Sequence, residues 1–355
     1  MKIVHVVGTR PNFVKMAPVI AATRRRFGES SSVVVHTGQH YDRAMSAIFI
    51  EELGVPEPDH MLGVGSGTHA HQAARVLERL APVLEDERPD FVLVPGDVNS
   101  TLAAALCAAR LGIPIGHVES GLRSFDRTMP EEINRVVADH LARLLFLHSA
   151  EAEDNLRVEG VPEDRWRFVG NTMIDTLVAL SDRFRGRGAA RRLGVEPGSY
   201  VLVTLHRPAL VDGPLLAETI AALDRVAERM PVVFPIHPRT RKMLGEGGAG
   251  RVTLIDPTGY LDFLSLEADA RAVLTDSGGI QEETTYLGIP CFTLRENTER
   301  PVTVRAGTNT LLGLRPGRIA EIPKLLEREP RGAPQPPEKW DGAAGERIAD
   351  VIADW

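Results

Sequence analysis

The sequence predicts two α/β domains, each built on a doubly wound parallel sheet. The chain has 355 residues, which corresponds to about two domains at roughly 150 residues per domain. Short β-rich runs alternate with helical patterns over nearly the whole length, as expected for parallel strands joined by crossover helices. Apolar residues make up 43% of the chain and charged residues 25%, so a sizeable core is available and wholesale disorder is excluded.

The first series of runs assigns residues 1–170 to one domain. Helices are expected from about Asn12, from about Arg43 and over STLAAALCAARLG. Strands are expected in KIVHVVG, SVVVHTG, FVLVPGD, IPIGHVE and LLFLHS.

The second series begins where charge and glycine interrupt the apolar pattern after Asp182, and assigns residues 171–335 to a second domain. Its strands are expected in YVLVTLH, PVVFPIH, VTLIDP, AVLTDSG and CFTL. Its helices are expected to start near Leu215, Leu261, Gly279 and Ile319. The two halves are therefore both Rossmann-like.

The last part of the chain is predicted to cross the surface and return. Residues 327–342 are rich in Pro, Gly and charge, which indicates an extended crossing. Residues 336–355 end in a helical apolar pattern and are expected to pack back on the first domain. Because parallel sheets present loops and helix N-termini at the carboxyl ends of their strands, we expect the ligand site in a cleft between the domains.

Charge and cysteine usage exclude several classes of protein. The net charge of -7 argues against a broad nucleic-acid footprint. The initial MKIVHVV is too short for a signal-peptide core, and we find no apolar run of the roughly 18 residues that a membrane span needs. Cys107 and Cys291 lie in apolar segments, which indicates buried thiols in a reducing compartment. We therefore expect a cytoplasmic protein without nucleic-acid or membrane partners.

A phosphate-binding loop is predicted in LTDSGGIQEETTYLG, residues 274–288. A strand runs into Ser277, Gly278 and Gly279, and a helix follows, so backbone N–H groups and the helix dipole would face an anion. Glu283 follows in the helix, where its carboxylate could accept hydrogen bonds from ribose hydroxyls. The alternative is a plain strand-to-helix turn with Ser277 as N-cap.

A second loop, GTRPNFVK, follows the first strand and places two cations near the same edge. Arg10 and Lys15 flank the helix start, and Pro11 is suited to its first turn. By itself this pattern is equally typical of ordinary surface cations.

Carboxylates follow two neighbouring strands of the first domain. Asp97 ends FVLVPGD and Glu119 ends IPIGHVE, so both should open onto the edge that carries Arg10. Carboxylates beside a diphosphate site indicate proton transfer on the attached group. Asp97 could instead be an N-cap of the next helix.

A third carboxylate, Glu131, lies in the first turn of a helix that begins at Pro130. At 100° per residue Glu131 falls about 160° from Ile133, so we expect it to point away from the packed face and be free to reach a ligand. Pairing of Glu131 and Glu132 with the helix dipole and Arg135 is the alternative. The apolar stripe of this helix is predicted to include Ile133, Val136, Val137, Leu141, Leu144 and Leu145.

Histidines end two strands of the second domain. His206, followed by Arg207, is a candidate phosphate contact, whereas His237 is as compatible with a structural role. His69 and His71 lack a carboxylate or cysteine cluster at metal-ligand spacing, so we assign no metal. No GxSxG elbow is present, and nothing supports a nucleophilic mechanism.

Taken together, these motifs resemble the non-hydrolysing UDP-N-acetylglucosamine 2-epimerases, which have the two-domain GT-B fold. The resemblance spans about residues 3–315. In the family's order the chain carries GTRPNFVKMAP, TGQHYD, PGDVNSTLAAAL, HVESGLRS, MPEEINR, VGNTMIDTL, TLHR, FPIHPRT, TDSGGIQEE and ENTERP.

The resemblance implies reversible interconversion of UDP-GlcNAc and UDP-ManNAc without a cofactor, by elimination of UDP to 2-acetamidoglucal and its re-addition. It also implies a homodimer. The family's acid/base carboxylates fall on Asp97, Glu119 and Glu131, and its phosphate-contacting histidine on His206. Substrate contacts fall on Arg10, Lys15, Arg207, Phe263, Ser277, Gly278, Gly279, Glu283 and Arg300.

Three departures from the family's pattern stand out. Pro208, Ala209 and Leu210 follow the TLHR motif where many relatives carry Glu-Asn, and Thr258 stands where some have Gln. Residues 41–42 differ from bacterial members with a second, regulatory UDP-GlcNAc site, so we predict no strong activation by added UDP-GlcNAc.

Four other functions stay open on the sequence. They are 2-epimerisation of a modified sugar such as UDP-2,3-diacetamido-2,3-dideoxyglucuronate, a hydrolysing epimerase that releases ManNAc, a GT-B glycosyltransferase, and a UDP-sugar-binding regulator. The sequence also leaves open which carboxylate removes the proton and which returns it.

Overall fold

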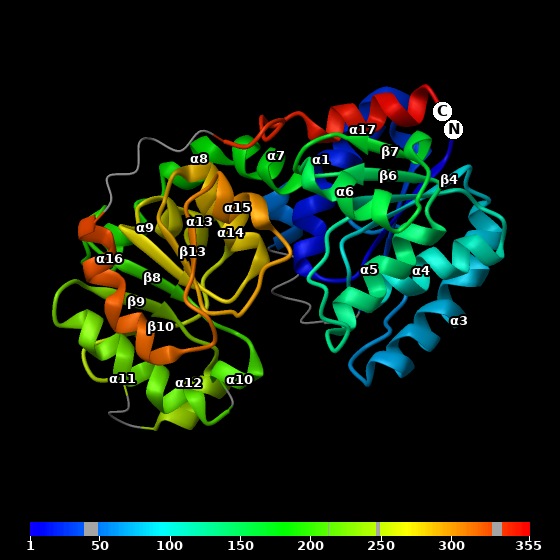
Figure 1. Ribbon diagram of the computed structural model, residues 1–355. Helices are drawn as coiled ribbons and strands as arrows, with labels where there is room; N and C mark the ends of the chain where they lie inside the picture. Colours follow the sequence, from blue (N-terminus) through cyan, green and yellow to red (C-terminus); the bar gives the residue numbers. More distant parts are fainter. Residues whose placement is uncertain (39–48, 212, 246–248, 329–335) are drawn as a thin grey trace. The chain divides into compact units, whose positions relative to one another are not determined.

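The chain folds into two compact units (Figure 1). Unit 1 comprises Met1–Ala179 with Glu338–Trp355, and unit 2 comprises Leu180–Pro337. The computed structural model describes residues 1–38, 49–211, 213–245, 249–328 and 336–355, so the start of the helix predicted from about Arg43 lies outside the described residues.

The sheet of unit 1 has seven strands in the order β3-β2-β1-β4-β5-β6-β7, and its strand pairs are parallel. The strand order reverses direction between β1 and β4, so the sheet is doubly wound and the ends of these strands form its switch point. The strands are β1 (Ile3–Val7), β2 (Ser32–His36), β3 (His60–Met61), β4 (Phe91–Pro95), β5 (Ile115–Ser120), β6 (Leu144–Leu147) and β7 (Trp166–Phe168).

Helices cover both faces of this sheet, which explains the nearly continuous apolar runs of its strands. Val4 and Val6 of β1 pack toward α3, α4 and α6, while Ile3 and Val7 pack toward α1 and α17. The helices are α1 (Arg10–Phe27), α3 (His69–Glu87), α4 (Asn99–Arg110), α5 (Pro130–Leu141), α6 (Glu151–Val158), α7 (Thr172–Ala179) and α17 (Ala344–Ala353), with 3₁₀ turns at Glu29–Ser31 and Glu163–Arg165.

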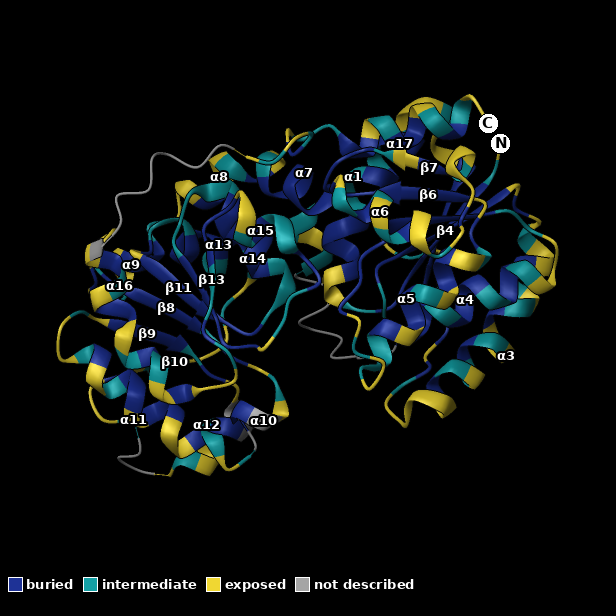
Figure 2. Ribbon diagram, in the orientation of Figure 1, coloured by how far each residue is buried: buried dark blue, intermediate teal, exposed yellow. Residues whose placement is uncertain are grey.

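The sheet of unit 2 repeats this plan with six parallel strands in the order β10-β9-β8-β11-β12-β13. Its switch point lies between β8 and β11. In both units the central strands are buried, whereas the edge strands β3, β7 and β10 are partly exposed and the outer helix faces are exposed (Figure 2). The strands are β8 (Val201–Thr204), β9 (Val232–Pro235), β10 (Thr253–Ile255), β11 (Ala272–Thr275), β12 (Cys291–Thr293) and β13 (Asn309–Leu311).

The helices of unit 2 again lie on both faces of its sheet. Residues of α11 share one apolar cluster with β8 and β9, while residues of α9 and α13 share the other. The helices are α8 (Ser181–Arg185), α9 (Ala189–Arg192), α10 (Pro208–Val211), α11 (Leu215–Ala227), α12 (Pro238–Leu244), α13 (Tyr260–Ala268), α14 (Gly278–Leu287), α15 (Pro301–Arg305) and α16 (Ile322–Arg328), with a 3₁₀ turn at Pro316–Glu321.

The C-terminal helix α17 belongs to unit 1, where it packs on α1. Asp175 of α7 accepts hydrogen bonds from the first backbone N–H groups of α17, at 3.1 Å from Ala344 and 2.7 Å from Gly345. Arg25 of α1 forms an ion pair with Glu346. Because α7 contacts both α1 and α17, unit 1 extends to Ala179, whereas the sequence placed the boundary at residue 170.

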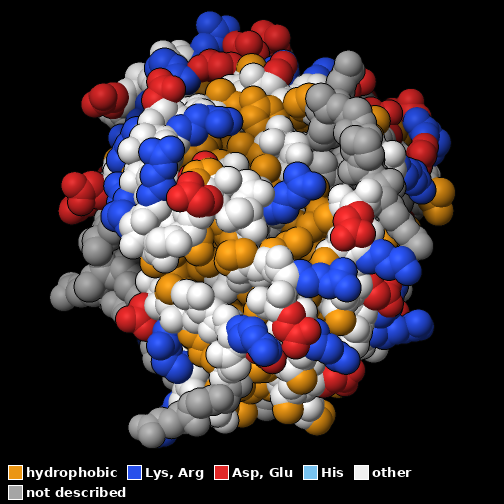
Figure 3. Space-filling view, turned by 90° about the vertical axis from the view of Figure 1, so that its left-hand side faces the viewer, with side chains coloured by type: hydrophobic (Ala, Val, Ile, Leu, Met, Phe, Trp, Pro, Cys, Tyr) orange, Lys and Arg blue, Asp and Glu red, His pale blue; other side chains and the backbone are white. Residues whose placement is uncertain are grey.

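Three observations concern the surface and the thiols of the described residues. Acidic and basic side chains are interspersed on the face of unit 2 drawn in Figure 3. None of the helices described in the structure is long and apolar enough to cross a membrane. Cys107 and Cys291 are buried free thiols.

Candidate active site

Asp97 and Glu119 lie next to each other at the carboxyl edge of unit 1, as predicted. Their strands β4 and β5 are paired in parallel, with Pro95 opposite Val118. Gly96, which directly precedes Asp97, adopts φ +60°. A Cβ added there would lie 3.0 Å from Lys15 Nζ and 3.3 Å from Glu119 Oε2. Glycine at this position therefore allows a cation and a carboxylate to approach the turn that carries Asp97.

Glu119 occupies a strained backbone position. Its φ is +68°, and the register between β5 and β6 shifts between Val118 and Ser120, so the strand bulges at this residue. A non-glycine residue in the left-handed region costs about 1–2 kcal/mol, and such residues concentrate at functional sites. The buried Lys15 of α1 donates a hydrogen bond to the Glu119 carboxylate, which holds the bulged side chain in place.

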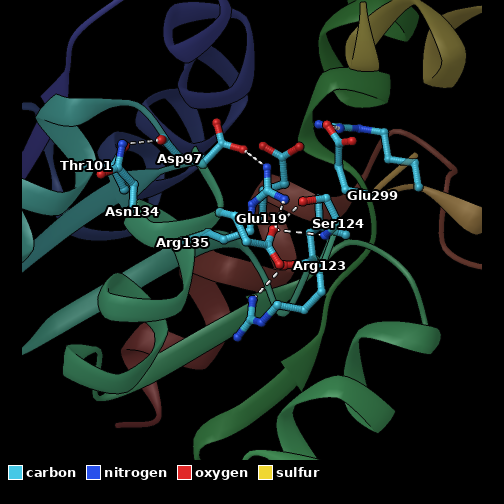
Figure 4. A network of polar contacts seen from close by, with 12 residues as sticks. Asp97, Thr101, Glu119, Arg123, Ser124, Asn134, Arg135 and Glu299 are labelled. Atoms are coloured by element: carbon cyan, nitrogen blue, oxygen red, sulfur yellow. Dashed lines mark hydrogen bonds and ion pairs between the residues drawn. The ribbon is translucent and has the colours of Figure 1, made fainter. Parts of the chain in front are cut away.

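Asp97 is held by a charged network from α5 (Figure 4). Arg135 forms an ion pair with Asp97 and, through Nη1, with Glu132 at 2.7 Å. Glu132 in turn accepts hydrogen bonds from Ser124 N and Oγ, both at 2.9 Å, and from Phe125 N at 2.8 Å. The side chain of Glu132 thus joins the motif MPEEINR to HVESGLRS, and Arg135 of the same motif joins it to the turn that carries Asp97.

Side-chain donors also fix the backbone around Asp97. Thr101 Oγ1 donates to Pro95 O at 2.6 Å, and Asn134 Nδ2 donates to Asp97 O at 2.8 Å (Figure 4). These contacts come from α4 and α5, so the position of Asp97 depends on two helices besides its own strand.

Helix α5 buries a polar face, and the predicted inward apolar stripe is wrong at Ile133 and Val137. Leu141 does pack on the core, whereas Leu144 and Leu145 are buried in β6 and not in this helix. Ile133 and Val137 are 50% and 36% exposed, while Glu132 and Arg135 are buried. Hydrogen bonds to the loop after β5 and to the turn after β4 outweigh the burial of these apolar side chains. Glu131 is half-buried and lies one helical turn before Arg135, on the same side of α5 and not opposite the packed face.

The remaining predicted residue of unit 1, Arg10, is exposed at the start of α1. Thr9 is the N-cap residue, and Pro11 lies in the first turn as expected. The side chain of Asn12 accepts hydrogen bonds from Gly8 N and Thr9 N, at 3.0 and 3.2 Å, which closes the loop after β1.

In unit 2 a buried carboxylate orients His206. Asp276 ends β11, the neighbour of β8, and lies 2.8 Å from His206 Nδ1. Its other oxygen accepts His206 N at 3.0 Å and Arg207 N at 2.8 Å. Burial would raise the pKa of Asp276, but His206 and the backbone donors outweigh it and hold that pKa below its usual value. Sequence reasoning missed this role, because Asp276 was seen only as part of the glycine loop.

The predicted phosphate loop begins α14. Ser277 is the N-cap residue, and within the described structure its side chain makes no capping hydrogen bond, so helix N–H groups face outward without it. A Cβ on Gly278 would lie 2.4 Å from Nη1 of Arg300, which explains the glycine. Arg300 is buried, 3.0 Å from Glu282 and 2.7 Å from Glu299. Gly279 is the second residue of α14.

Glu283 is buried in the second turn of α14. Tyr260 Oη donates to its carboxylate at 2.9 Å, a contact that the sequence reasoning missed. Burial raises the pKa of Glu283 to about 8. Glu267, a buried neighbour on α13, likewise has a raised pKa because of burial and the nearby Glu283. Phe263, also on α13, is half-buried.

Each unit therefore presents a chemically distinct edge. Unit 1 offers acids paired with buried cations, which suits proton transfer. Unit 2 offers a helix N-terminus with an Asp-oriented histidine, which suits a bound phosphate. The described residues include no cluster of three or more His, Cys, Asp or Glu side chains placed to hold a metal.

Comparison with known proteins decides the family. The sequence model of the family "UDP-N-acetylglucosamine 2-epimerase" matches residues 23–353. The chain belongs to this family. The UDP-N-acetylglucosamine 2-epimerase of Methanococcus maripaludis is 40% identical over 99% of this chain and 98% of its own length. The family resemblance read from the motifs is confirmed.

Two further comparisons bear on substrate and fold. The UDP-2,3-diacetamido-2,3-dideoxy-D-glucuronate 2-epimerase of Pseudomonas aeruginosa is 41% identical over 90% of this chain and 91% of its own length. A crystal structure of the Methanocaldococcus jannaschii UDP-GlcNAc 2-epimerase, in complex with UDP-GlcNAc and UDP, superposes with a TM-score of 0.88 at 39% identity, covering 100% of both chains. The predicted fold class, two doubly wound domains of the GT-B type, is confirmed.

Proposed function

We propose that this chain catalyses reversible C2 epimerisation of UDP-GlcNAc and UDP-ManNAc. The observation that carries the proposal is the pairing at the edge of unit 1, where Asp97 and Glu119 each lie against a buried cation. Carboxylates fixed in this way can act as the acid and base groups that a proton-transfer reaction needs. Family membership and the bound nucleotides of the Methanocaldococcus jannaschii structure support the same substrate class.

The reaction begins with elimination. The C1–O bond breaks, its electron pair leaves with UDP, and a carboxylate removes the C2 proton to give 2-acetamidoglucal. UDP then adds back at C1, and a carboxylic acid delivers a proton to the opposite face of C2. Asp97, Glu119 and Glu131 are assigned to proton transfer and to stabilising the positive charge that develops at C1.

Departure and return of UDP require a site that holds the diphosphate in both steps. His206, oriented by Asp276, and the N-terminus of α14 are assigned to the phosphates. Glu283 is assigned to the ribose hydroxyls. The other assigned substrate contacts are Arg10, Lys15, Arg207, Phe263, Ser277, Gly278, Gly279 and Arg300.

The charges at the edge of unit 1 favour a neutral sugar over a uronate. Lys15 pairs with Glu119, and Arg135 pairs with both Asp97 and Glu132, so these buried cations already carry carboxylate partners. A uronate would add another negative charge beside these acids and would require a further cation. We therefore place UDP-GlcNAc ahead of UDP-2,3-diacetamido-2,3-dideoxyglucuronate, although relatives of both kinds are about equally similar.

Time-resolved product analysis tests the proposal. Purified protein given UDP-GlcNAc should form UDP-ManNAc until a constant ratio is reached, and the same ratio should be reached from UDP-ManNAc. An Asp97→Asn variant is the matched control. Accumulation of free ManNAc with UDP would establish a hydrolysing enzyme, sugar transfer to an added acceptor would establish a transferase, and binding without turnover would leave a regulator.

Several expectations from the sequence stay predictions. They are the homodimer, the cytoplasmic location, the ligand cleft between the domains and the absence of strong activation by UDP-GlcNAc. Residues 41 and 42, on which the last depends, lie outside the described residues. Sigmoidal kinetics with UDP-ManNAc that become hyperbolic on adding UDP-GlcNAc would contradict it.

A further inference from the structure

His117 is a fully buried histidine of β5 that the proposed mechanism does not use. Its Nδ1 lies 2.6 Å from Asp139 Oδ1, and its Nε2 lies 2.7 Å from the carbonyl oxygen of Gly96. Both ring nitrogens therefore face oxygen acceptors. A neutral imidazole has one N–H and one lone pair, so one of these short contacts would set a lone pair against an oxygen.

A carboxylate fixed by several partners holds one end of the ring. Asp139 of α5 also accepts Gly121 N at 3.0 Å and pairs with Arg123 at 2.7 Å, and Arg123 binds Glu159 through two contacts of 2.7 Å. Burial would raise the pKa of Asp139, but His117 and Arg123 outweigh it and hold that pKa below its usual value. Two carboxylates thus face Arg123 and the His117 ring. Arg165 Nη2 also donates to the backbone oxygen of Asp139 at 3.1 Å, and the partly exposed Glu159 lies 3.5 Å from His140.

The acceptor at the other end of the ring belongs to the peptide that carries Asp97. Gly96 lies between Pro95 and Asp97, and the carbonyl oxygens of all three residues accept side-chain hydrogen bonds. Thr101 binds the first, His117 the second and Asn134 the third. His117 thereby connects the peptide of Asp97 to the ion pair of Asp139 and Arg123.

We propose that His117, held by Asp139, is a positioning residue that fixes the Gly96–Asp97 peptide and with it the acid/base group Asp97. This inference rests on the proposed function for its catalytic part only. The ring state and the placement of the peptide are properties of the chain itself.

Nitrogen NMR of the histidine side chains tests the ring state without any turnover. Nε2 of the His117 ring should carry a proton in the wild-type protein, because it faces the carbonyl oxygen of Gly96 at 2.7 Å. His5, buried on β1 of the same sheet, is the internal reference, because burial and the nearby Arg24 lower its pKa to about 3 and keep it neutral. An unprotonated Nε2 on His117 would overturn the proposal.

Two variants test positioning. His117→Gln should lower kcat about 10- to 100-fold with little change in KM, since small misplacements of a reacting group cost that much. Asp139→Asn should keep more activity, because the asparagine amide can donate to Nδ1 while a neutral ring still donates from Nε2 to Gly96 O. His117→Gln therefore tests the contact of the ring with Gly96 O, whereas Asp139→Asn tests the charge of the carboxylate that holds the ring.

His5→Gln is the matched control for burying a glutamine in this sheet, and its kcat should stay near that of the wild type. A crystal structure of His117→Gln should show the Gly96–Asp97 peptide displaced. An unmoved peptide, or an unchanged kcat in a folded His117→Gln, would overturn the proposal. If His117→Gln does not fold, the NMR signals of the wild-type His117 ring and the kcat of Asp139→Asn test the proposal instead. A loss of kcat in Asp139→Asn as large as that in Asp97→Asn would contradict positioning through Nε2.

The failure of the proposed function gives a different result. A wild-type protein that does not epimerise UDP-GlcNAc would refute the proposed function, while the ring signature and the displaced peptide would still report on His117.

Discussion

Replacement of Asp276 by asparagine tests whether the buried carboxylate of unit 2 sets the orientation of His206. One carboxylate oxygen lies 2.8 Å from Nδ1, and the other accepts from His206 N at 3.0 Å and from Arg207 N at 2.8 Å. Asparagine has nearly the same size as aspartate, but it keeps only one acceptor oxygen and carries an NH₂ donor in place of the other oxygen. Losing one hydrogen bond to a charged group costs about 1.5–3 kcal/mol. If that loss falls on His206, kcat/KM should drop about 10- to 150-fold.

Steady-state kinetics of a double-mutant cycle supplies the assay. His206→Gln should reduce kcat/KM strongly in the wild type and only weakly in the Asp276→Asn background, because the ring is already misplaced there. Urea unfolding measured alongside separates this effect from a general loss of stability. Fully additive losses in the cycle would refute the idea that Asp276 acts through His206.

The same carboxylate has a consequence for acid stability. The folded-state pKa of Asp276 lies below the ordinary value of 3.8, so its stabilisation is present above that value and is lost as pH falls through the folded pKa. Asp276→Asn should lack this acid-dependent part of the unfolding free energy.

Three other predictions concern stored strain, the C-terminal helix and pH. The free energy of unfolding of Glu119→Gly should be about 1–2 kcal/mol larger than that of Glu119→Ala, because glycine accepts a positive φ. Equal urea midpoints for the two variants would show that no strain is stored. Asp175→Ala should lose about 2 kcal/mol of unfolding free energy, because Ala344 N and Gly345 N lose their acceptor, and an unchanged urea midpoint would contradict the capping role. Burial raises the pKa of Glu283 from 4.5 to about 8, so the wild-type protein should lose unfolding free energy as pH rises between these values. Glu283→Gln should lose less over the same range. Identical plots of unfolding free energy against pH for the two proteins would contradict this.

Much of the fold could be predicted because its signals are local. Runs such as KIVHVVG are apolar at every position, which is typical of strands covered on both faces, and helical patterns follow them. The strands that escaped prediction, β3, β7 and β13, are only two or three residues long, and tertiary pairing defines them more than their own composition.

The candidate site could be predicted in part. The end of a parallel strand is visible in the sequence, so Asp97 and Glu119 were placed correctly side by side. The face of α5 was predicted wrongly, because apolar periodicity says nothing about a network in which Arg135 and Glu132 are buried by mutual pairing.

The partners of the site residues arise from contacts between distant parts of the chain. Lys15 meets Glu119 across 104 residues, and His206 meets Asp276 across 70. Such pairs follow from the order of the strands in the sheet and from a bulge that no sequence motif announces. Their prediction required the three-dimensional arrangement.

Proton NMR of a reaction run in D₂O shows whether the hydrogen at C2 exchanges with solvent. With UDP-GlcNAc as substrate, we expect deuterium at C2 of the UDP-ManNAc formed and of the UDP-GlcNAc recovered, because solvent supplies the returning proton. Epimerisation that keeps the original hydrogen at C2 would contradict it.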